Sequence, residues 1–194
     1  MEIGDDPIGG LRTWIESAHA AGAREANAMS LASVGEDCRP ALRMVLLRDL
    51  DERGLIFFTS YFSRKGRDLA RNPSAAALFF WPETHRQVSI EGTIEQLSGD
   101  ESDAYFATRP RGHQLSAWAS EQSEAVESRE VLEQRLEDFT KRFEGDTVPR
   151  PHSWGGLLLR PERFEFWQGR SNRLHDRIEM RLSAAGWTRR RLQP

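Results

Sequence analysis

The densest group of side chains capable of chemistry lies near the end of the chain, in the segment FWQGRSNRLHDR at Phe166–Arg177. In an extended strand, Arg173, His175 and Arg177 project from one face, because side chains alternate between the two faces. Cations on one strand face repel each other unless an anion or an electron-rich group lies among them. Trp167 provides a flat apolar wall for a ring system. The segment therefore predicts a ligand site, and a surface strand whose arginines pair with nearby carboxylates is the alternative.

A second basic group surrounds the predicted hairpin between Leu42 and Lys65. Arg43 stands in an otherwise apolar strand, where an unpaired charge is costly. Across the hairpin come Thr59 and the pair Arg64 and Lys65, at the start of a predicted helix. A hydroxyl, a guanidinium and an ammonium beside a helix N-terminus suit a phosphate. The alternative is an edge-strand arginine that reaches solvent, next to a solvated helix start.

The third basic group is in the segment YFATRPRGH, which contains Tyr105, Arg109, Arg111 and His113. Tyr105 and Arg109 are four residues apart and share one helical face. A phenol beside a guanidinium suits a phosphate or a carboxylate. An exposed helix end, where cations complement the helix dipole, explains the same pattern, and both interpretations stay open.

Together with the amides of Gln87 and Gln122, the three groups predict a planar, phosphorylated ligand, or two such ligands. The formal net charge of -3 gives the whole molecule no attraction to nucleic acid or to a membrane surface. Only Lys65 and Lys141 among the 27 basic residues are lysines. Codon bias in a GC-rich genome explains such a surplus of arginine, so position rather than number must identify the functional arginines.

Length and composition indicate one folded globular domain. The chain has 194 residues, of which 38% are apolar, enough to bury a core. It has no apolar run near the roughly 18 residues of a membrane span, and its acidic start is unlike a signal peptide. The single cysteine, Cys38, excludes an intramolecular disulfide and a multi-cysteine metal site. We therefore expect a cytoplasmic, reducing location.

Hydrophobic periodicity predicts a mainly β protein with peripheral helices, an α+β arrangement. Helices are predicted at residues 9–23, 63–72, 98–108, 114–120 and 127–143. Strands are predicted at residues 29–34, 40–50, 55–60, 75–81, 87–97, 157–160, 164–167, 177–182 and 187–192. Short strands with helices inserted between them favour an antiparallel, barrel-like sheet. The chain has no GxGxxG or GxxxxGK[ST] loop, which argues against a Rossmann or P-loop nucleotide site.

Several of these segments resemble the pyridoxine/pyridoxamine 5'-phosphate oxidase family. The resemblance rests on RMVLLRDLDERGLIFFTSYFSRKGRDLARNP, RQVSIEGTIEQL, YFATRPR, ASEQS, SWGG and FEFWQGRSNRLHDR, and it extends from about Asp6 to the end. It implies an FMN-binding split β-barrel of antiparallel Greek-key type. It further implies one domain over residues 1–194, with a helical insertion at about 98–145 and C-terminal strands at 157–194 that complete the barrel and the active site. It also implies a homodimer with FMN at the subunit interface.

The resemblance assigns roles residue by residue. The implied FMN-binding residues are Arg43, Met44, Val45, Leu46, Leu47, Arg48, Phe58, Thr59, Arg64, Lys65, Gln87, Gln122, Ser123, Trp167 and Arg177. Within this set, Arg64 and Lys65 hold the FMN phosphate. The implied substrate-binding residues are Arg48, Tyr105, Arg109, His113, Arg173, Leu174 and His175. Arg173 and His175 are the implied catalytic pair, and no metal is implied.

The implied activity is that of an oxidoreductase acting on CH–NH2 donors with oxygen as acceptor. Hydride passes from the C4' carbon of pyridoxamine or pyridoxine 5'-phosphate to the flavin N5, which yields pyridoxal 5'-phosphate in vitamin B6 biosynthesis. Oxygen then reoxidises the flavin and gives hydrogen peroxide, and the amine substrate also releases ammonia. Arg173 stabilises charge as hydride leaves, while His175 positions or deprotonates the substrate.

The chain departs from the family pattern at the implied substrate site. Arg48 replaces the usual lysine, and His113 replaces the usual serine beside the substrate phosphate. Few residues precede the first predicted helix, whereas family members often carry a longer arm there. Two alternatives therefore accompany the main hypothesis. One is a related FMN-dependent oxidase or reductase for another ring, such as a phenazine precursor, and the other is a non-catalytic flavin- or pyridoxal-phosphate-binding protein.

Overall fold

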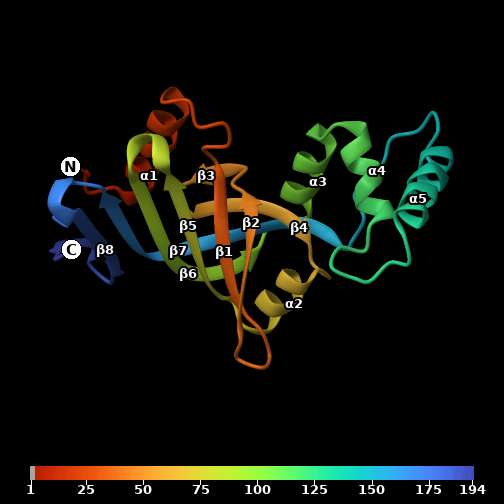
Figure 1. Cartoon of the computed structure of the whole chain (residues 1–194). Coiled ribbons are helices and arrows are strands. Elements are labelled where there is room, and N and C mark those ends of the chain that lie inside the picture. Colours follow the sequence, from red (N-terminus) through yellow and green to blue (C-terminus); the bar gives the residue numbers. More distant parts are fainter. Residues whose placement is uncertain (1–2) are drawn as a thin grey trace.

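The computed structural model describes residues 3–194 and contains one antiparallel sheet with helices at its margins (Figure 1). The strands are β1 Ala28–Val34, β2 Pro40–Leu46, β3 Asp49–Asp51, β4 Gly54–Ser60, β5 Ser74–Trp81, β6 Arg86–Gln96, β7 Trp154–Gln168, β8 Asp176–Ser183 and β9 Gly186–Leu192. The helices are α1 Pro7–Ala20, α2 Arg64–Arg71, α3 Gly99–Thr108, α4 Arg111–Ala119 and α5 Arg129–Arg142, with 3-10 turns η1 Pro82–Thr84 and η2 Ser171–Arg173. The mainly β architecture with peripheral helices is as predicted.

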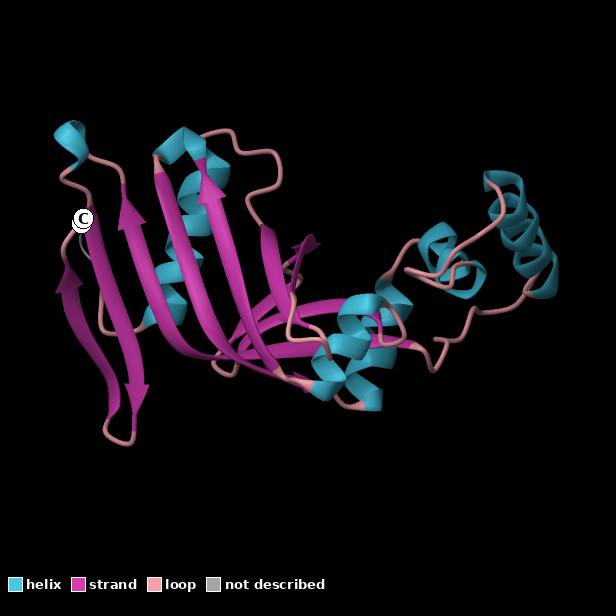
Figure 2. Ribbon diagram, turned by 60° about the horizontal axis from the view of Figure 1, so that its bottom comes forward, coloured by secondary structure: helices cyan, strands magenta, loops and turns pink. Residues whose placement is uncertain are grey.

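The sheet is curled because its two edges are joined by a very short link. Its main path runs β2-β1-β5-β6-β7-β4-β3, and β8 and β9 extend it from β7. Only residues 47–48 connect β2 at one edge to β3 at the other, a span of at most about 11 Å. Leu47 N–H donates to Asn27 O near one edge, and Arg48 N–H donates to Ile56 O on β4. The sheet therefore closes on itself as a half-barrel (Figure 2).

The core fills the concave side of this curl. Along β1 every second residue is buried, as expected for a strand with one face inward. Helix α1 places Leu11, Trp14 and Ala18 against the sheet, and Trp14 meets the Phe166 ring edge-on at 5.2 Å between centroids. Burying each large apolar side chain of this kind contributes about 1.5–3 kcal/mol. The sheet and α1 thus form the rigid frame from which the polar clusters project.

Locally encoded features agree with the sequence prediction. Ser63 caps α2 by accepting from Gly66 N–H, and Ser98 forms a capping box at the start of α3. The tight turn at Asp51–Gly54 joins β3 to β4. Helix α4 begins earlier than predicted, at Arg111, because Pro110 serves as its N-cap residue, where its missing N–H is tolerated.

The predicted single strand at residues 40–50 is wrong. The segment is divided into β2, which pairs with β1, and β3, which pairs with β4. Arg43 on β2 is therefore not across a hairpin from Thr59 on β4. The division occurs because Leu47 and Arg48 bond to different edges of the sheet, which closes the curl at that point.

The predicted extended strand through Arg173, His175 and Arg177 is also wrong. Strand β8 begins only at Asp176, and the residues before it form η2. Arg173 has a φ of 61°, in the left-handed region, so it cannot continue a strand. A third prediction also differs from the structure: the two strands predicted at 157–160 and 164–167 form one continuous strand, β7.

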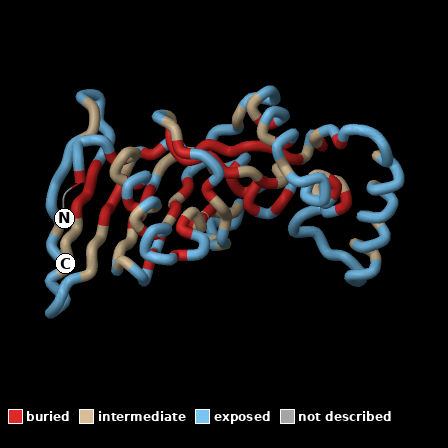
Figure 3. Tube along the Cα trace, turned by 90° about the horizontal axis from the view of Figure 1, so that it is seen from above, coloured by how far each residue is buried: buried red, intermediate tan, exposed pale blue. Residues whose placement is uncertain are grey.

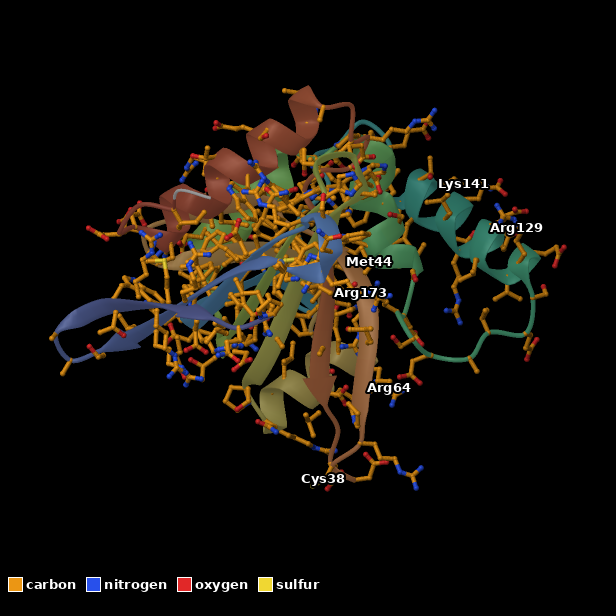
Figure 4. All side chains as sticks on the ribbon, turned by 60° about the vertical axis from the view of Figure 1, so that its left-hand side comes forward. Cys38, Met44, Arg64, Arg129, Lys141 and Arg173 are labelled. Atoms are coloured by element: carbon orange, nitrogen blue, oxygen red, sulfur yellow. The ribbon has the colours of Figure 1, made fainter. Side chains whose placement is uncertain are left out.

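Helices α3, α4 and α5 gather at one end of the molecule, and the C-terminal strands lie at the other (Figures 1 and 2). Most of the helical end is exposed, while burial is concentrated in the sheet (Figure 3). Cys38 is exposed at the tip of the β1–β2 hairpin (Figure 4). Within residues 3–194 no helix is both long and apolar enough to cross a membrane.

Candidate functional site

A pocket of about 380 Å³ lies where α3 and α4 approach β4 and the start of β7. We call it the helical-end pocket. Its lining residues are Arg48, Phe58, Thr59, Ser60, Tyr105, Arg109, Ser116, Ala117, Ser120, Gln122 and Trp154. Two cations, several hydroxyls and three aromatic rings therefore face one cavity, and none of its lining residues is acidic.

Aromatic rings form one wall of this pocket. Phe58 and Tyr105 are stacked with centroids 3.7 Å apart and planes at 9°, and Trp154 lies nearly parallel to Phe58 at 5.4 Å. The glycines that follow Trp154 permit this close packing. A Cβ at Gly155 would lie 2.0 Å from the Tyr61 hydroxyl oxygen. The SWGG motif therefore brings β7 against its neighbours and sets the position of the wall.

Arg109, the C-cap residue of α3, is half-buried, and its guanidinium has unused hydrogen-bonding capacity. Its guanidinium carbon lies 4.4 Å from the centroid of the Trp154 ring, and its Nη1 has no hydrogen-bond partner among residues 3–194. Burial lowers the pKa of Arg109, Tyr105 opposes that shift, and Arg48 adds to it. A buried guanidinium N–H without an acceptor is costly, so this atom is suited to binding an anion.

Lys65 is the centre of a second donor group, beside the same pocket. Its Nζ donates to Thr59 Oγ1 and Gln122 Oε1 at 3.0 Å each, and to Ser63 Oγ at 3.3 Å. All three acceptors are uncharged. Burial, together with the charge of Arg43, lowers the pKa of Lys65 to about 8. The Lys65 ammonium thus has no negatively charged acceptor among these three partners, and a bound phosphate would supply one.

Arg43 reaches this neighbourhood by a route that the sequence prediction missed. Its Nη1 donates to Ser33 Oγ at 2.7 Å, and its Nη2 lies 3.8 Å from Asp68 Oδ2 on α2. Asp68 also accepts from Ser33 Oγ at 2.8 Å. Burial lowers the pKa of Arg43, Asp68 opposes the shift and Arg64 adds to it. The predicted basic group therefore does assemble, through the packing of α2 on β1.

A second pocket, of about 480 Å³, lies at the other end of β7. We call it the strand-end pocket. It is lined by His85, Trp167, Gly169, Arg170, Ser171 and His175. The His175 ring lies 4.6 Å from that of Trp167, and its Nδ1 accepts from the backbone N–H of Arg170 at 3.1 Å. That hydrogen bond assigns the proton of a neutral His175 to Nε2.

The other residues predicted for this region surround the strand-end pocket. Gln87 on β6 and Arg177 on β8 are the two cross-strand partners of Trp167. Arg173 and Leu174 are exposed, Leu174 by 71%. Arg177 is paired with Glu165 rather than with Asp176, which instead binds Arg170 and Arg191.

One chain does not bring the two pockets together. Trp154 is the first residue of β7 and Trp167 is its penultimate residue, so the two are on the order of 40 Å apart along the strand. Figures 1 and 2 show the helical end and the C-terminal strands at opposite ends of the molecule. Six predicted ligand-binding residues line the helical-end pocket, and these are Arg48, Phe58, Thr59, Tyr105, Arg109 and Gln122.

Some predicted residues lie outside both pockets, and some pocket residues escaped prediction. His113 is exposed on the first turn of α4 and does not line the helical-end pocket. Along β2, Met44 is exposed and Leu47, just beyond the strand, is buried. Trp154 and His85 were missed. The tryptophan of the SWGG motif was the one available signal, because it precedes two glycines that allow close packing.

A curled antiparallel sheet with a basic, aromatic pocket beneath a helical segment defines a split-barrel protein whose pocket suits an anionic ring compound. A family model described as pyridoxamine 5'-phosphate oxidase matches residues 15–143. A second, described as the pyridoxine 5'-phosphate oxidase C-terminal dimerisation region, matches residues 154–194. The chain belongs to the pyridoxine/pyridoxamine 5'-phosphate oxidase family.

Curated relatives match over nearly the full chain. The pyridoxine/pyridoxamine 5'-phosphate oxidase of Rubrobacter xylanophilus is 57% identical over 189 residues, covering 97% of this chain and 87% of the relative. That of Trichormus variabilis is 50% identical, covering 100% of this chain and 91% of the relative. The predicted family resemblance is thereby confirmed.

Two solved structures share the fold. PhzG from Burkholderia lata, in complex with tetrahydrophenazine-1-carboxylic acid, has a TM-score of 0.94 and 33% identity, covering 100% of this chain and 95% of PhzG. A pyridoxamine 5'-phosphate oxidase-related, FMN binding protein from Nostoc punctiforme has a TM-score of 0.77 and 19% identity, covering 100% of both chains. The predicted split-barrel fold is therefore confirmed.

Proposed function

We propose that the protein is an FMN-dependent oxidase that converts pyridoxamine and pyridoxine 5'-phosphate to pyridoxal 5'-phosphate, with oxygen as acceptor and hydrogen peroxide as product. The observation that carries this proposal is the buried, unpaired Nη1 of half-buried Arg109 in a pocket walled by aromatic rings. A phosphorylated pyridine supplies both the anion and the flat ring that this pocket lacks. The names of relatives 57% and 50% identical support the same activity.

The chain's donor groups fit FMN as the cofactor. The Lys65 ammonium, the Thr59 hydroxyl and the Gln122 amide converge within hydrogen-bonding distance of one another and would hold the FMN phosphate. Arg64, at the start of α2, adds a cation beside a helix N-terminus. Trp167, Gln87 and Arg177 would meet the ring system. When bound, FMN supplies the two-electron redox step and the reaction with oxygen.

We assign the complete active site to a homodimer. The helical-end pocket of one protomer and the strand-end pocket of its partner form one site, because the two pockets of a single chain lie too far apart. The outer sheet face also exposes Leu42, Met44 and Phe80 by 70%, 61% and 59%. An apolar patch of this kind is typical of an interaction surface. The match of residues 154–194 to a dimerisation region supports the same arrangement.

Within that site the residues have separate tasks. Arg109, Arg48 and Tyr105 bind the substrate phosphate and hold the ring against the aromatic wall. Arg173 of the partner subunit stabilises charge as hydride leaves the substrate carbon. His175 of the partner subunit donates from Nε2, because its Nδ1 accepts from the backbone of Arg170. This geometry favours a role for His175 in positioning the substrate over one in deprotonating it.

The proposed function is tested with purified protein and added FMN. Oxygen consumption and peroxide formation are measured with pyridoxamine 5'-phosphate and with pyridoxine 5'-phosphate. Turnover of either substrate with equimolar peroxide supports the oxidase. A protein that binds FMN and pyridoxal 5'-phosphate but makes no peroxide is a carrier, and the oxidase proposal then fails.

A phenazine precursor is the second candidate substrate, favoured by the 33% identity to PhzG over the whole chain. The two candidates differ in the phosphate group, for which Arg48 and Arg109 form a site. A kcat/KM at least about tenfold higher for pyridoxamine 5'-phosphate, equivalent to ~1.4 kcal/mol, supports the first candidate. A higher value for a reduced phenazine carboxylic acid overturns it.

His113 offers a prediction on the substrate phosphate. The His113→Ser variant is expected to raise the KM for pyridoxamine 5'-phosphate by no more than about fivefold, with kcat unchanged, because His113 is exposed and does not line the helical-end pocket, and exposed polar interactions contribute at most ~1 kcal/mol. Steady-state kinetics measure this effect. The matched control is a ring substrate without phosphate, for which the variant should behave as wild type. A larger rise would mean that His113 contacts the phosphate directly.

Lys65 gives a prediction on pH. Its pKa in the free protein is lowered to about 8, and a bound phosphate favours the charged ammonium. Below pH 8 the dissociation constant of FMN should therefore be constant, and above pH 8 it should rise, by up to about tenfold per pH unit. Quenching of flavin fluorescence on binding measures this constant.

Two lysine variants separate this effect from general alkaline damage. Lys65→Arg should remove the rise up to about pH 10, because a guanidinium remains charged. Lys141→Arg is the matched control, because Lys141 lies on α5, away from Arg64 and the phosphate site (Figure 4). A rise that persists in Lys65→Arg would assign the titration to another group.

A further inference from the structure

A network of ion pairs covers the outer face of β6–β9, beside the strand-end pocket. We call it the charge ladder. Its carboxylates are Glu91, Glu165 and Glu179, and its guanidiniums are Arg163, Arg177, Arg181 and Arg190. Glu165 and Glu179 are only 9% and 2% exposed, because the arginine side chains cover them. Of its members, only Arg177 belongs to the proposed flavin site.

Glu165 joins Arg177 to the rest of the ladder. Its Oε1 accepts from Arg177 Nε at 2.8 Å and lies 2.7 Å from Arg177 Nη2, while its Oε2 accepts from Arg163 Nη2 at 2.8 Å. On its other side, Arg177 Nη1 donates to the backbone oxygen of Gln193 at 3.0 Å. Two separate acceptors therefore fix the plane of the Arg177 guanidinium.

The rest of the charge ladder fixes the position of Glu165 through Arg163. Arg163 donates from Nε to Glu179 at 2.7 Å and from Nη1 to Glu91 at 2.6 Å. Hydrogen bonds from Arg181, and then from Arg163 and Arg190, lower the pKa of Glu179 to about 2 despite its burial. The central carboxylate of the ladder thus stays charged at all ordinary pH values, and Arg163 keeps a fixed position between Glu179 and Glu165.

The positions of Glu165 and Arg177 in the sheet indicate that the charge ladder does more than stabilise the fold. Glu165 and Trp167 are two apart on β7 and share a face, and Arg177 is the direct cross-strand partner of Trp167. Glu165 therefore contacts Arg177 along the diagonal, within reach of long side chains. Burying ion pairs seldom adds net stability, so a buried glutamate at this point has a better explanation in orienting its arginine.

We infer that Glu165 is a positioning residue for the flavin: it orients the Arg177 guanidinium beside Trp167 and offsets part of its charge. This inference rests on the proposed function, because Arg177 matters to FMN only if FMN binds at this face. Without the Glu165 carboxylate, Arg177 keeps its charge but loses its main fixed acceptor. FMN must then order that side chain as it binds, and its affinity falls.

The test is a double-mutant cycle on FMN affinity. The variants are Glu165→Gln, Arg177→Ala and the double variant, each purified without flavin and titrated with FMN by fluorescence quenching. Glu165→Gln should raise the dissociation constant about tenfold, as expected for loss of a hydrogen bond to a charged group. In the Arg177→Ala background, the same substitution should change it less than about twofold, because the arginine through which it acts is gone.

Glu91→Gln is the matched control. It removes the same charge from the same Arg163 but does not touch Arg177, so its FMN affinity should stay within about twofold of wild type. Thermal unfolding of each flavin-free variant checks the fold. If Glu165→Gln does not yield folded protein, Glu165→Asp replaces it, since the shorter side chain keeps the charge beside Arg163 but withdraws from Arg177.

The outcomes are distinct. An effect of Glu165→Gln that vanishes with Arg177→Ala supports the inference. Equal affinities for the Glu165 and Glu91 variants overturn it, as do independent, multiplicative effects of the Glu165 and Arg177 substitutions. Failure of the proposed function would instead be seen in the wild-type protein, as absence of FMN binding or of peroxide formation, and would remove the inference as well.

Discussion

Replacing Arg109 by alanine is expected to lower kcat/KM for pyridoxamine 5'-phosphate by about 10³-fold, equivalent to ~4 kcal/mol, while FMN stays bound. The guanidinium lies over the Trp154 ring, and its buried Nη1 has no acceptor among residues 3–194. Charged hydrogen bonds to a phosphate in such a site contribute about 1.5–3 kcal/mol each. Peroxide formation at varied substrate concentration measures the effect.

Most of this loss should be in KM. The phosphate lies away from the reacting carbon, so Arg109 binds substrate and transition state nearly equally. Arg111→Ala is the matched control, because Arg111 is exposed and donates to the backbone oxygens of Phe143 and Asp146 rather than toward the pocket. Its kcat/KM should match that of wild type. Similar losses in the two variants would contradict a phosphate site at Arg109.

The second large effect is the recovery of enzyme activity when subunits of two inactive variants are combined in mixed dimers. Arg173→Ala should abolish turnover while leaving FMN bound, and Arg109→Ala should be nearly inactive at low substrate. In a two-fold dimer with shared sites, a mixed dimer has one site with both changes and one with neither. The purified mixed dimers should therefore show about half of the wild-type activity, because one of their two sites is intact. Co-expression of differently tagged subunits, followed by sequential affinity purification and assay, measures this recovery.

The control for this experiment pairs two changes in the same pocket. Arg109→Ala mixed with Tyr105→Ala should recover no activity, because both residues line the helical-end pocket and every site of a mixed dimer keeps one change. Recovery in that control would mean that Arg109 and Tyr105 reach the same site from different subunits. No recovery with Arg173→Ala would place the whole site within one chain.

The sequence was sufficient where structure is set by neighbouring residues. The capping box at Ser98 and the cap at Ser63 involve contacts within one helical turn, so their patterns predicted both helix starts. The prediction of a single strand at 40–50 was wrong because the break at Leu47 and Arg48 is set by the closure of the sheet. No local sequence pattern encodes that closure. The left-handed backbone at Arg173 likewise has no residue signature, because glycine is absent there.

For the candidate site, residue types were predictable but their grouping was not. From the sequence alone, a phosphate site was one interpretation of Lys65 and of Arg109, and a solvated helix end was the other. The contact between Lys65 and Gln122 depends on how the loop after α4 returns to β4, over a separation of 57 residues. Trp154 was overlooked because a buried tryptophan beside glycines is as typical of a core as of a ligand wall. The division into two distant pockets could be seen only from the continuity of β7.

Because β7 is one continuous strand, the activity of the proposed dimer should depend on protein concentration. In the proposed dimer, a lone chain has Trp154 at one end of β7 and Trp167 at the other, so it would hold one half of each of two centres and complete neither. Specific activity should accordingly decline on dilution, as dimers dissociate and both centres are lost in the same event.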